Sequence, residues 1–161
     1  MNKPSILPII IGTGFGSGFW PWGPGTAGAV LATIIWAALS YALPAHILFI
    51  STLAAIIVFT WLGTWATARL MPFWGDDPKR VVMDEMVGVW VPLLACPPLP
   101  QGLSAWGWAA AALILFRLFD IFKPLGIRRI DNMRGAFYVM ADDLAAGLYS
   151  VALILLAQWV I

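Results

Sequence analysis

The sequence predicts an all-α protein, a polytopic helical bundle of about five helical segments embedded in a membrane. Hydrophobic residues make up 61% of the chain and charged residues 11%, whereas an ordinary soluble domain is about 25% charged. The charge is also sorted, because sixteen of the seventeen Asp, Glu, Lys and Arg side chains fall within residues 69–85 and 117–143. A soluble domain spreads charge over its surface, since each of its helices needs a wet face. The pattern therefore predicts a membrane protein with one polar, active face.

Five apolar segments, separated by polar or proline-containing turns, account for this helical count. They cover residues 26–43, 45–70, 81–95, 104–122 and 142–161. A spanning helix needs about 20 mainly apolar residues, and helices satisfy their own backbone hydrogen bonds in lipid. The third segment is the weakest, because it opens with Asp84 and Glu85 and contains Pro92, so we expect it to reach only most of the way across. Together the segments predict a single membrane-embedded domain over residues 1–161.

A glycine-rich segment, residues 12–28, precedes the first of these helices and holds seven glycines in seventeen residues. Glycine lets backbone N–H groups approach an anion closely, and a helix N-terminus favours negative charge. On this reading Gly25 and Thr26, which follow Pro24, are candidates for phosphate binding. Alternatively, small residues at close spacing pack helices together in lipid. The residues alone do not choose between these two readings.

The distribution of basic residues predicts the orientation of the chain. Seven of the nine Lys and Arg residues lie in the connections 69–80 and 123–134, whereas the connections near Pro44 and at residues 97–102 carry no charge. Cytoplasmic loops carry the excess of Lys and Arg in membrane proteins. We therefore expect the active face to lie on the cytoplasmic side.

Two adjacent acidic pairs stand at the predicted starts of two helices. They are Asp84 with Glu85, and Asp142 with Asp143. Any one such carboxylate is ordinarily a helix cap, but four anions on one membrane face repel each other unless cations neutralise them. Oxygen ligands of this kind suit Mg²⁺, whereas one His and one Cys do not suit zinc. The four carboxylates are therefore predicted metal ligands.

A second group of charges, Arg117, Asp120 and Lys123, recurs every three residues near the end of the fourth segment. Successive members lie about 60° apart on a helix, so they form a stripe that we expect to face the bundle interior. Arg117 and Lys123 would bind phosphoryl oxygens, and Asp120 would orient water or hold the ion. The alternative is that Arg117 and Asp120 merely neutralise each other while Lys123 reaches toward the membrane surface.

Four separated motifs extend this reading over most of the chain. They are Gly16-Ser17-Gly18 with Pro21 and Pro24-Gly25-Thr26 with Gly28; Asp77 with Val82-x-Asp84-Glu85-x-Val87-Gly88; Phe116-Arg117-x-Phe119-Asp120-Ile121-x-Lys123-Pro124; and Met140-x-Asp142-Asp143-x-x-Ala146-Gly147. In order and spacing they resemble the phosphatidylglycerophosphatase A family. Two departures from the family pattern fall in the basic loop, at residues 123–127 and 135–138, and a third is Pro78, which follows Asp77 where some relatives have His; the loop changes leave the acids and bases intact.

The resemblance implies a Mg²⁺-dependent lipid phosphatase of the bacterial inner membrane, which converts phosphatidylglycerophosphate to phosphatidylglycerol and phosphate. The expected partners are the phospholipid substrate and the lipid bilayer, with no nucleic acid, and the sequence leaves the oligomeric state open. The catalytic candidates are Asp84, Glu85, Asp120 and Asp143. The attacking group is either water activated by a carboxylate or an Asp nucleophile, and both alternatives stay open at this point.

Two other classes of membrane protein also place ionisable residues in spans. A small ion-coupled transporter would need polar groups nearer the middle of the membrane, where this chain has almost none. A CDP-alcohol phosphotransferase would also use metal and membrane aspartates, but its D-G-x-x-A-R run with two further aspartates is missing from the sequence. A purely structural membrane protein gives no reason to concentrate acids and bases on one side.

Overall fold

The computed structural model describes residues 3–124 and 126–160, and every regular element within them is helical. In chain order these elements are α1 (Ile6–Gly12), η1 (Ser17–Phe19), α2 (Pro24–Ala42), α3 (Ala45–Trp74), α4 (Met83–Leu93), η2 (Leu99–Gln101), α5 (Leu103–Phe122), α6 (Ile127–Asp131) and α7 (Ala136–Val160). Leu125 of the basic loop and Ile161 of the last predicted segment lie outside the described residues.

Four of the described helices, α2, α3, α5 and α7, are long and apolar enough to cross a membrane. This confirms the predicted helical membrane bundle. The helix α4 has 11 residues, which corresponds to about 16 Å at 1.5 Å per residue, against a hydrocarbon core of about 30 Å. The third predicted segment is therefore shorter than residues 81–95, since the helix ends at Leu93, with Pro92 inside its last turn.

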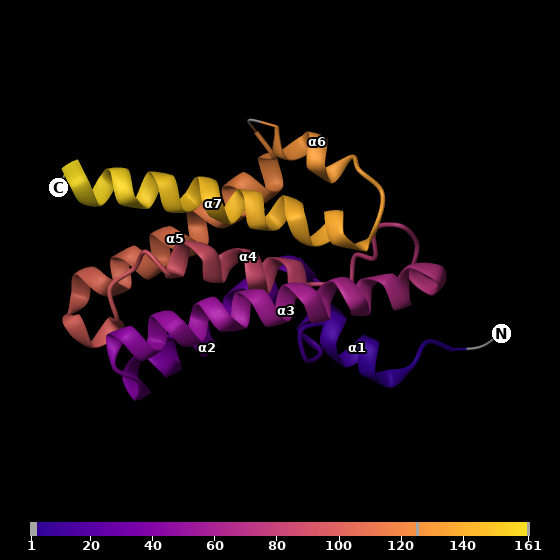
Figure 1. Cartoon of the computed structure of the whole chain (residues 1–161), viewed down its shortest axis with the longest axis horizontal. Helices are drawn as coiled ribbons and strands as arrows, with labels where there is room; N and C mark the ends of the chain where they lie inside the picture. The colour runs from indigo at the N-terminus through magenta and orange to yellow at the C-terminus, as the bar shows by residue number, and fades with distance from the viewer. Residues whose placement is uncertain (1–2, 125, 161) are drawn as a thin grey trace.

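The short helix α4 forms the centre of the bundle. All of its residues are buried except Asp84 and Glu85, which are partly exposed, as expected for a helix that is hydrophobic all round. It packs most extensively against α7 and α2, and Figure 1 shows it between α7 and α3. Its acidic first turn therefore opens to one end of the bundle while the remainder is enclosed by longer helices.

Two glycines allow α4 and α7 to approach closely. A Cβ on Gly147 would lie 2.5 Å from the carbonyl oxygen of Gly88 and 2.8 Å from the Cβ of Val91. Small residues let helix backbones pack in this way in a membrane. Because residues four apart lie on the same face of a helix, Asp84 and Asp143 each lie one turn before these glycines. The close contact therefore brings two acidic residues from distant parts of the sequence together.

Most of the glycine-rich segment supports the α3–α4 connection. The Val82 N–H donates to the carbonyl oxygen of Gly12 at 2.8 Å, and a Cβ on Gly18 would overlap the carbonyl oxygen of Arg80. The Arg80 guanidinium also lies over the ring of Phe19, 5.5 Å from its centroid. These contacts are packing contacts, and they fix the loop that leads into α4.

Candidate functional site

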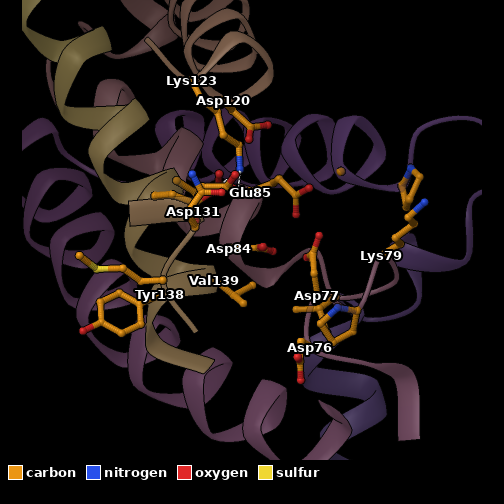
Figure 2. A pocket seen from close by; sticks show the side chains of 18 of the residues that line it. Asp76, Asp77, Lys79, Asp84, Glu85, Asp120, Lys123, Asp131, Tyr138 and Val139 are labelled. Atoms are coloured by element: carbon orange, nitrogen blue, oxygen red, sulfur yellow. Dashed lines mark hydrogen bonds and ion pairs between the residues drawn. The ribbon is translucent and has the colours of Figure 1, made fainter. Parts of the chain in front are cut away.

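A cavity of about 590 Å³ opens at the end of the bundle where α2, α4 and α7 begin and α5 ends. Figure 2 labels charged side chains of the cavity from α4, from the end of α5, from α6 and from the α3–α4 connection. Of the nine residues that the sequence places in the site, eight line the cavity: Gly25, Asp84, Glu85, Arg117, Asp120, Lys123, Asp142 and Asp143. The ninth, Thr26, is exposed and does not line the described part of the cavity.

Three of the acidic residues form a compact cluster that fits a metal ion. Asp84, Glu85 and Asp143 each offer a carboxylate oxygen, and these atoms all lie within 4.8 Å of one another. One oxygen of each side chain is buried without a hydrogen-bond partner among the described residues, and Asp143 is only 3% exposed. Buried charges of the same sign need a compensating partner. The cluster is therefore suited to a cation that prefers oxygen ligands.

The fourth predicted ligand, Asp142, faces a different partner. Its Oδ2 accepts a hydrogen bond from Lys123 Nζ at 2.5 Å, while its Oδ1 is buried without a partner among the described residues. Successive residues of a helix point about 100° apart, so Asp142 and Asp143 cannot point in the same direction. The structure thus separates the four predicted ligands into a cluster of three and one ion-paired carboxylate.

The start of α7 also differs from the prediction. The helix begins at Ala136, six residues before Asp142. Both aspartates therefore lie almost two turns inside the helix, where a side chain cannot cap its N-terminus. The capping interpretation therefore does not apply to Asp142 and Asp143. Both side chains are instead buried beside the cavity.

The two predicted phosphate-binding cations are already in contact with carboxylates. Arg117 forms an ion pair with Asp120, and its Nη1 lies 3.9 Å from Glu85 Oε1. Its Nε is buried without a partner among the described side chains and backbone groups. Arg117 thus links the metal-type cluster to Asp120 and keeps one donor free.

Lys123 ends α5 in a left-handed conformation, with φ of 47°. It forms ion pairs with Asp131 of α6 and Asp142 of α7. Burial favours its neutral form, but the hydrogen bonds and charges of these two carboxylates outweigh burial and raise the pKa of Lys123 above its ordinary value. Lys123 is therefore cationic at physiological pH and holds the α6–α7 region against the end of α5.

Gly25 contributes space to the site. A Cβ at this position would overlap the Glu85 carboxylate and lie 3.2 Å from Arg117 Nη1. The absence of a side chain at the start of α2 therefore allows the carboxylate and the guanidinium to meet there. This contact places Gly25 in the site for a steric reason, in addition to the backbone donor considered from the sequence.

Sequence reasoning missed several charged residues that also line the cavity. The α3–α4 connection supplies Asp76, Asp77 and Lys79, and the α6–α7 region supplies Asp131 and Arg134. Their signal in the sequence was their place in the same two charged blocks, and Asp77 also stands within one of the matching motifs. Loop residues carry no helical periodicity, so the sequence did not indicate which of them turn toward the helix ends.

The single cysteine has no part in this site. Burial raises the pKa of the Cys96 thiol to about 12, so the thiolate needed for nucleophilic attack is scarce at neutral pH. Neither Cys96 nor His46 lines the cavity as far as the structure describes it. Both observations agree with the prediction that the chemistry does not use cysteine or histidine.

Comparison with known proteins gives consistent family matches. The model of the family described as phosphatidylglycerophosphatase A matches residues 10–158. Proteins named "Phosphatidylglycerophosphatase A" from Haemophilus influenzae and Escherichia coli are 36% and 33% identical, covering 99% and 90% of this chain and 94% and 80% of their own lengths. A Bacteroides thetaiotaomicron protein named "Putative phosphatidylinositol-3-phosphatase" is 55% identical over 100% of this chain and 99% of its own. No solved structure gives a significant match.

Proposed function

The chain belongs to the phosphatidylglycerophosphatase A family, and we propose that it hydrolyses the terminal phosphate monoester of phosphatidylglycerophosphate to phosphatidylglycerol and phosphate. The observation that carries this proposal is the family match over nearly the whole chain, including every charged residue that lines the cavity. The position of that cavity at the ends of membrane-type helices supports a lipid substrate, whose phosphate lies at the membrane surface while its acyl chains stay in the bilayer.

The acidic cluster supports Mg²⁺ as the cofactor. Asp84, Glu85 and Asp143 would hold the ion, since each has a buried carboxylate oxygen to donate. When bound, the ion would neutralise charge on the phosphoryl group and polarise it for attack. Asp142 would contribute by positioning Lys123, from which it accepts a hydrogen bond.

Arg117 and Lys123 each have a donor available for a phosphoryl oxygen. The Nε of Arg117 is buried beside the cavity without a partner among the described residues. Lys123 has three N–H donors, and its ion pairs with Asp131 and Asp142 use two of them. Both side chains can therefore bind phosphate even though they already contact carboxylates. Asp120 holds the Arg117 guanidinium in place.

The basic residues support a cytoplasmic location for the active face. We place the cavity on the cytoplasmic side of a bacterial inner membrane, because the α3–α4 and α5–α7 connections at this end carry most of the Lys and Arg residues. This orientation would give the cavity access to lipid headgroups of the inner leaflet.

A second candidate substrate is a phosphatidylinositol 3-phosphate. It is favoured by the name of the Bacteroides thetaiotaomicron relative, which is more similar to this chain than the two proteins named for phosphatidylglycerophosphate. Both reactions break a phosphate monoester on a phospholipid headgroup, so the same metal and phosphate site serves either. Tyr138, in one of the regions that departs from the family pattern, lines the cavity and offers a headgroup contact.

The test is phosphate release by the purified protein from phosphatidylglycerophosphate, phosphatidylinositol 3-phosphate and phosphatidic acid, each with Mg²⁺ or with EDTA. The proposal predicts the highest kcat/KM on phosphatidylglycerophosphate and loss of activity in EDTA. A higher kcat/KM on the inositol lipid would replace the first candidate with the second. Failure to release phosphate from any of the three lipids would contradict both candidates.

A further inference from the structure

We propose that Asp77 is the general base that takes a proton from the attacking water. The proposal rests on the proposed lipid phosphatase function and adds a catalytic residue to it. It also chooses between the two attacking groups that the sequence left open, because it assigns the attack to water and not to an aspartate.

The first support comes from the roles that the other carboxylates already have. Eight carboxylates among the described residues line the cavity: Asp76, Asp77, Asp84, Glu85, Asp120, Asp131, Asp142 and Asp143. Asp84, Glu85 and Asp143 form the metal-type cluster. The carboxylates of Asp120, Asp131 and Asp142 are ion-paired with Arg117 or Lys123. In the described part of the chain, only Asp76 and Asp77 remain without a metal-type or ion-pair partner.

The direction of the side chains separates these two. Figure 2 shows the Asp77 carboxylate pointing into the cavity toward Asp84 and Glu85, whereas the Asp76 carboxylate points the opposite way. Asp77 is also outside the compact cluster of three carboxylates. It therefore faces the metal-type site from another part of the wall of the same cavity of about 590 Å³, which is where the substrate phosphate would bind.

The loop that carries Asp77 is held in a defined position. Pro78 is buried, and its carbonyl oxygen accepts a hydrogen bond from Val81 N–H at 2.7 Å. The next residue, Val82, is tied to Gly12, and Arg80 lies over Phe19. A general base must be positioned within reach of the proton that it removes, and these contacts restrict the movement of the loop.

The proposed step balances as a simple hydrolysis. Asp77 accepts one proton from water as the water oxygen forms a bond to phosphorus, and the bond between phosphorus and the headgroup oxygen breaks. The headgroup oxygen leaves with the electron pair and is protonated through solvent by the proton that Asp77 took up. The products are the lipid alcohol and inorganic phosphate, and Asp77 returns to its starting state.

The test compares Asp77→Asn with the neighbouring control Asp76→Asn. General-base catalysis contributes about 10²–10⁴-fold, so Asp77→Asn should lower kcat by that factor while the Mg²⁺ concentration for half-maximal activity stays unchanged. Asp76→Asn should keep the wild-type kcat. Both variants should elute from size exclusion as the wild type does, because both side chains are exposed.

Several results would overturn the assignment. A wild-type kcat in Asp77→Asn would exclude a role as base, and a raised Mg²⁺ requirement would make Asp77 a metal ligand. A phosphorylated enzyme trapped during turnover would replace water attack by attack from an aspartate. Because wild-type activity is measured in the same assay, the two possible failures can be told apart. An active wild type together with an unchanged kcat in Asp77→Asn would contradict only this inference. An inactive wild type would contradict the proposed function.

Discussion

At the scale of single residues, the defining feature of the site is negative charge that is buried without compensation. Asp84, Glu85 and Asp143 approach one another at the end of the bundle with unpartnered oxygens. Arg117 is the only described cation in contact with this cluster, and its nearest approach to Glu85 is 3.9 Å. Such an arrangement opposes folding unless a cation binds. A cation bound there would therefore serve the stability of the fold as well as the proposed chemistry.

Replacing a cluster carboxylate should separate these two effects. We expect Asp84→Asn and Asp143→Asn to abolish phosphate release while the protein still inserts and folds. In EDTA, thermal unfolding of either variant should occur at or above the wild-type temperature, because one repelling charge is gone. Mg²⁺ at about 100 times its Kd should stabilise the wild type by about 2.7 kcal/mol, and this shift should be lost in Asp143→Asn.

Asp76→Asn is the matched control, since it removes an aspartate that lines the cavity but points away from the cluster. It should keep both the activity and the Mg²⁺-dependent rise in unfolding temperature. Near-wild-type turnover in both cluster variants would remove the carboxylate mechanism. The same Mg²⁺ shift in wild type and Asp143→Asn would place the ion elsewhere.

In the proposed function, Arg117 supplies a positive charge that stabilises the transition state. We expect Arg117→Ala to lower kcat by about 10²–10³, by analogy with the loss of an oxyanion donor. The exposed Arg129 of α6 does not line the described cavity, so Arg129→Ala is the control and should leave kcat unchanged. If the two substitutions lowered kcat equally, Arg117 would contribute only to the general positive charge of this face.

At the scale of the elements, the contact between α4 and α7 sets the geometry of the site. Gly88 and Gly147 lie where the two helices are closest, one turn from Asp84 and Asp143. Any added atom there must separate the helices or tilt one of them. The distance between the two carboxylates is therefore controlled by residues that have no chemistry of their own.

Gly147→Ala should for this reason reduce both stability and Mg²⁺ affinity. The added methyl group would meet backbone and Cβ atoms of α4, and overpacking of this kind costs about 1–3 kcal/mol. Gly107→Ala on α5 is the control, because a Cβ there meets nothing within 4 Å and alanine favours helix by about 0.5–1 kcal/mol. Thermal unfolding with and without Mg²⁺ measures both effects. A Gly147→Ala variant as stable as Gly107→Ala would contradict the close packing.

The elements also show why the sequence predicts some of this structure and not the rest. The long apolar helices and the end at which the charges gather follow from hydropathy and charge alone, as α5 and its Arg117 stripe illustrate. The acidic first turn and Pro92 of α4 indicate a weak span, but its length of 11 residues is seen only in the structure. Which of Asp142 and Asp143 faces the metal-type cluster depends on the rotation of α7 against α4, and the inward turn of Asp77 depends on a loop. Neither is encoded in a local periodicity.

At the scale of the whole molecule, the two ends of the bundle differ in chemistry. The cavity and its charged connections lie at one end, whereas the α2–α3 turn at Pro44 and the α4–α5 connection carry no charge. In Figure 1 the α3–α4 connection lies toward the end marked by the N-terminus, and the C-terminus lies at the opposite end. A lipid phosphatase needs this polarity, because its phosphate site must stay in water at the headgroup level while the remaining surface contacts acyl chains.

This polarity leads to a topology that cysteine labelling can measure. In a Cys96→Ala background, Arg129→Cys on α6 and Asp76→Cys in the α3–α4 connection should both face the cytoplasm, because basic residues stay on that side. Gln101→Cys, exposed in η2 at the uncharged end, should face the periplasm. A membrane-impermeant maleimide should then label Gln101→Cys in intact spheroplasts, and the other two only after permeabilisation.

Labelling of Arg129→Cys and Asp76→Cys from opposite sides would contradict a single cavity, because both connections line it in the structure. Labelling of both from outside would keep the fold and reverse its orientation, which would place the phosphate site at the outer leaflet.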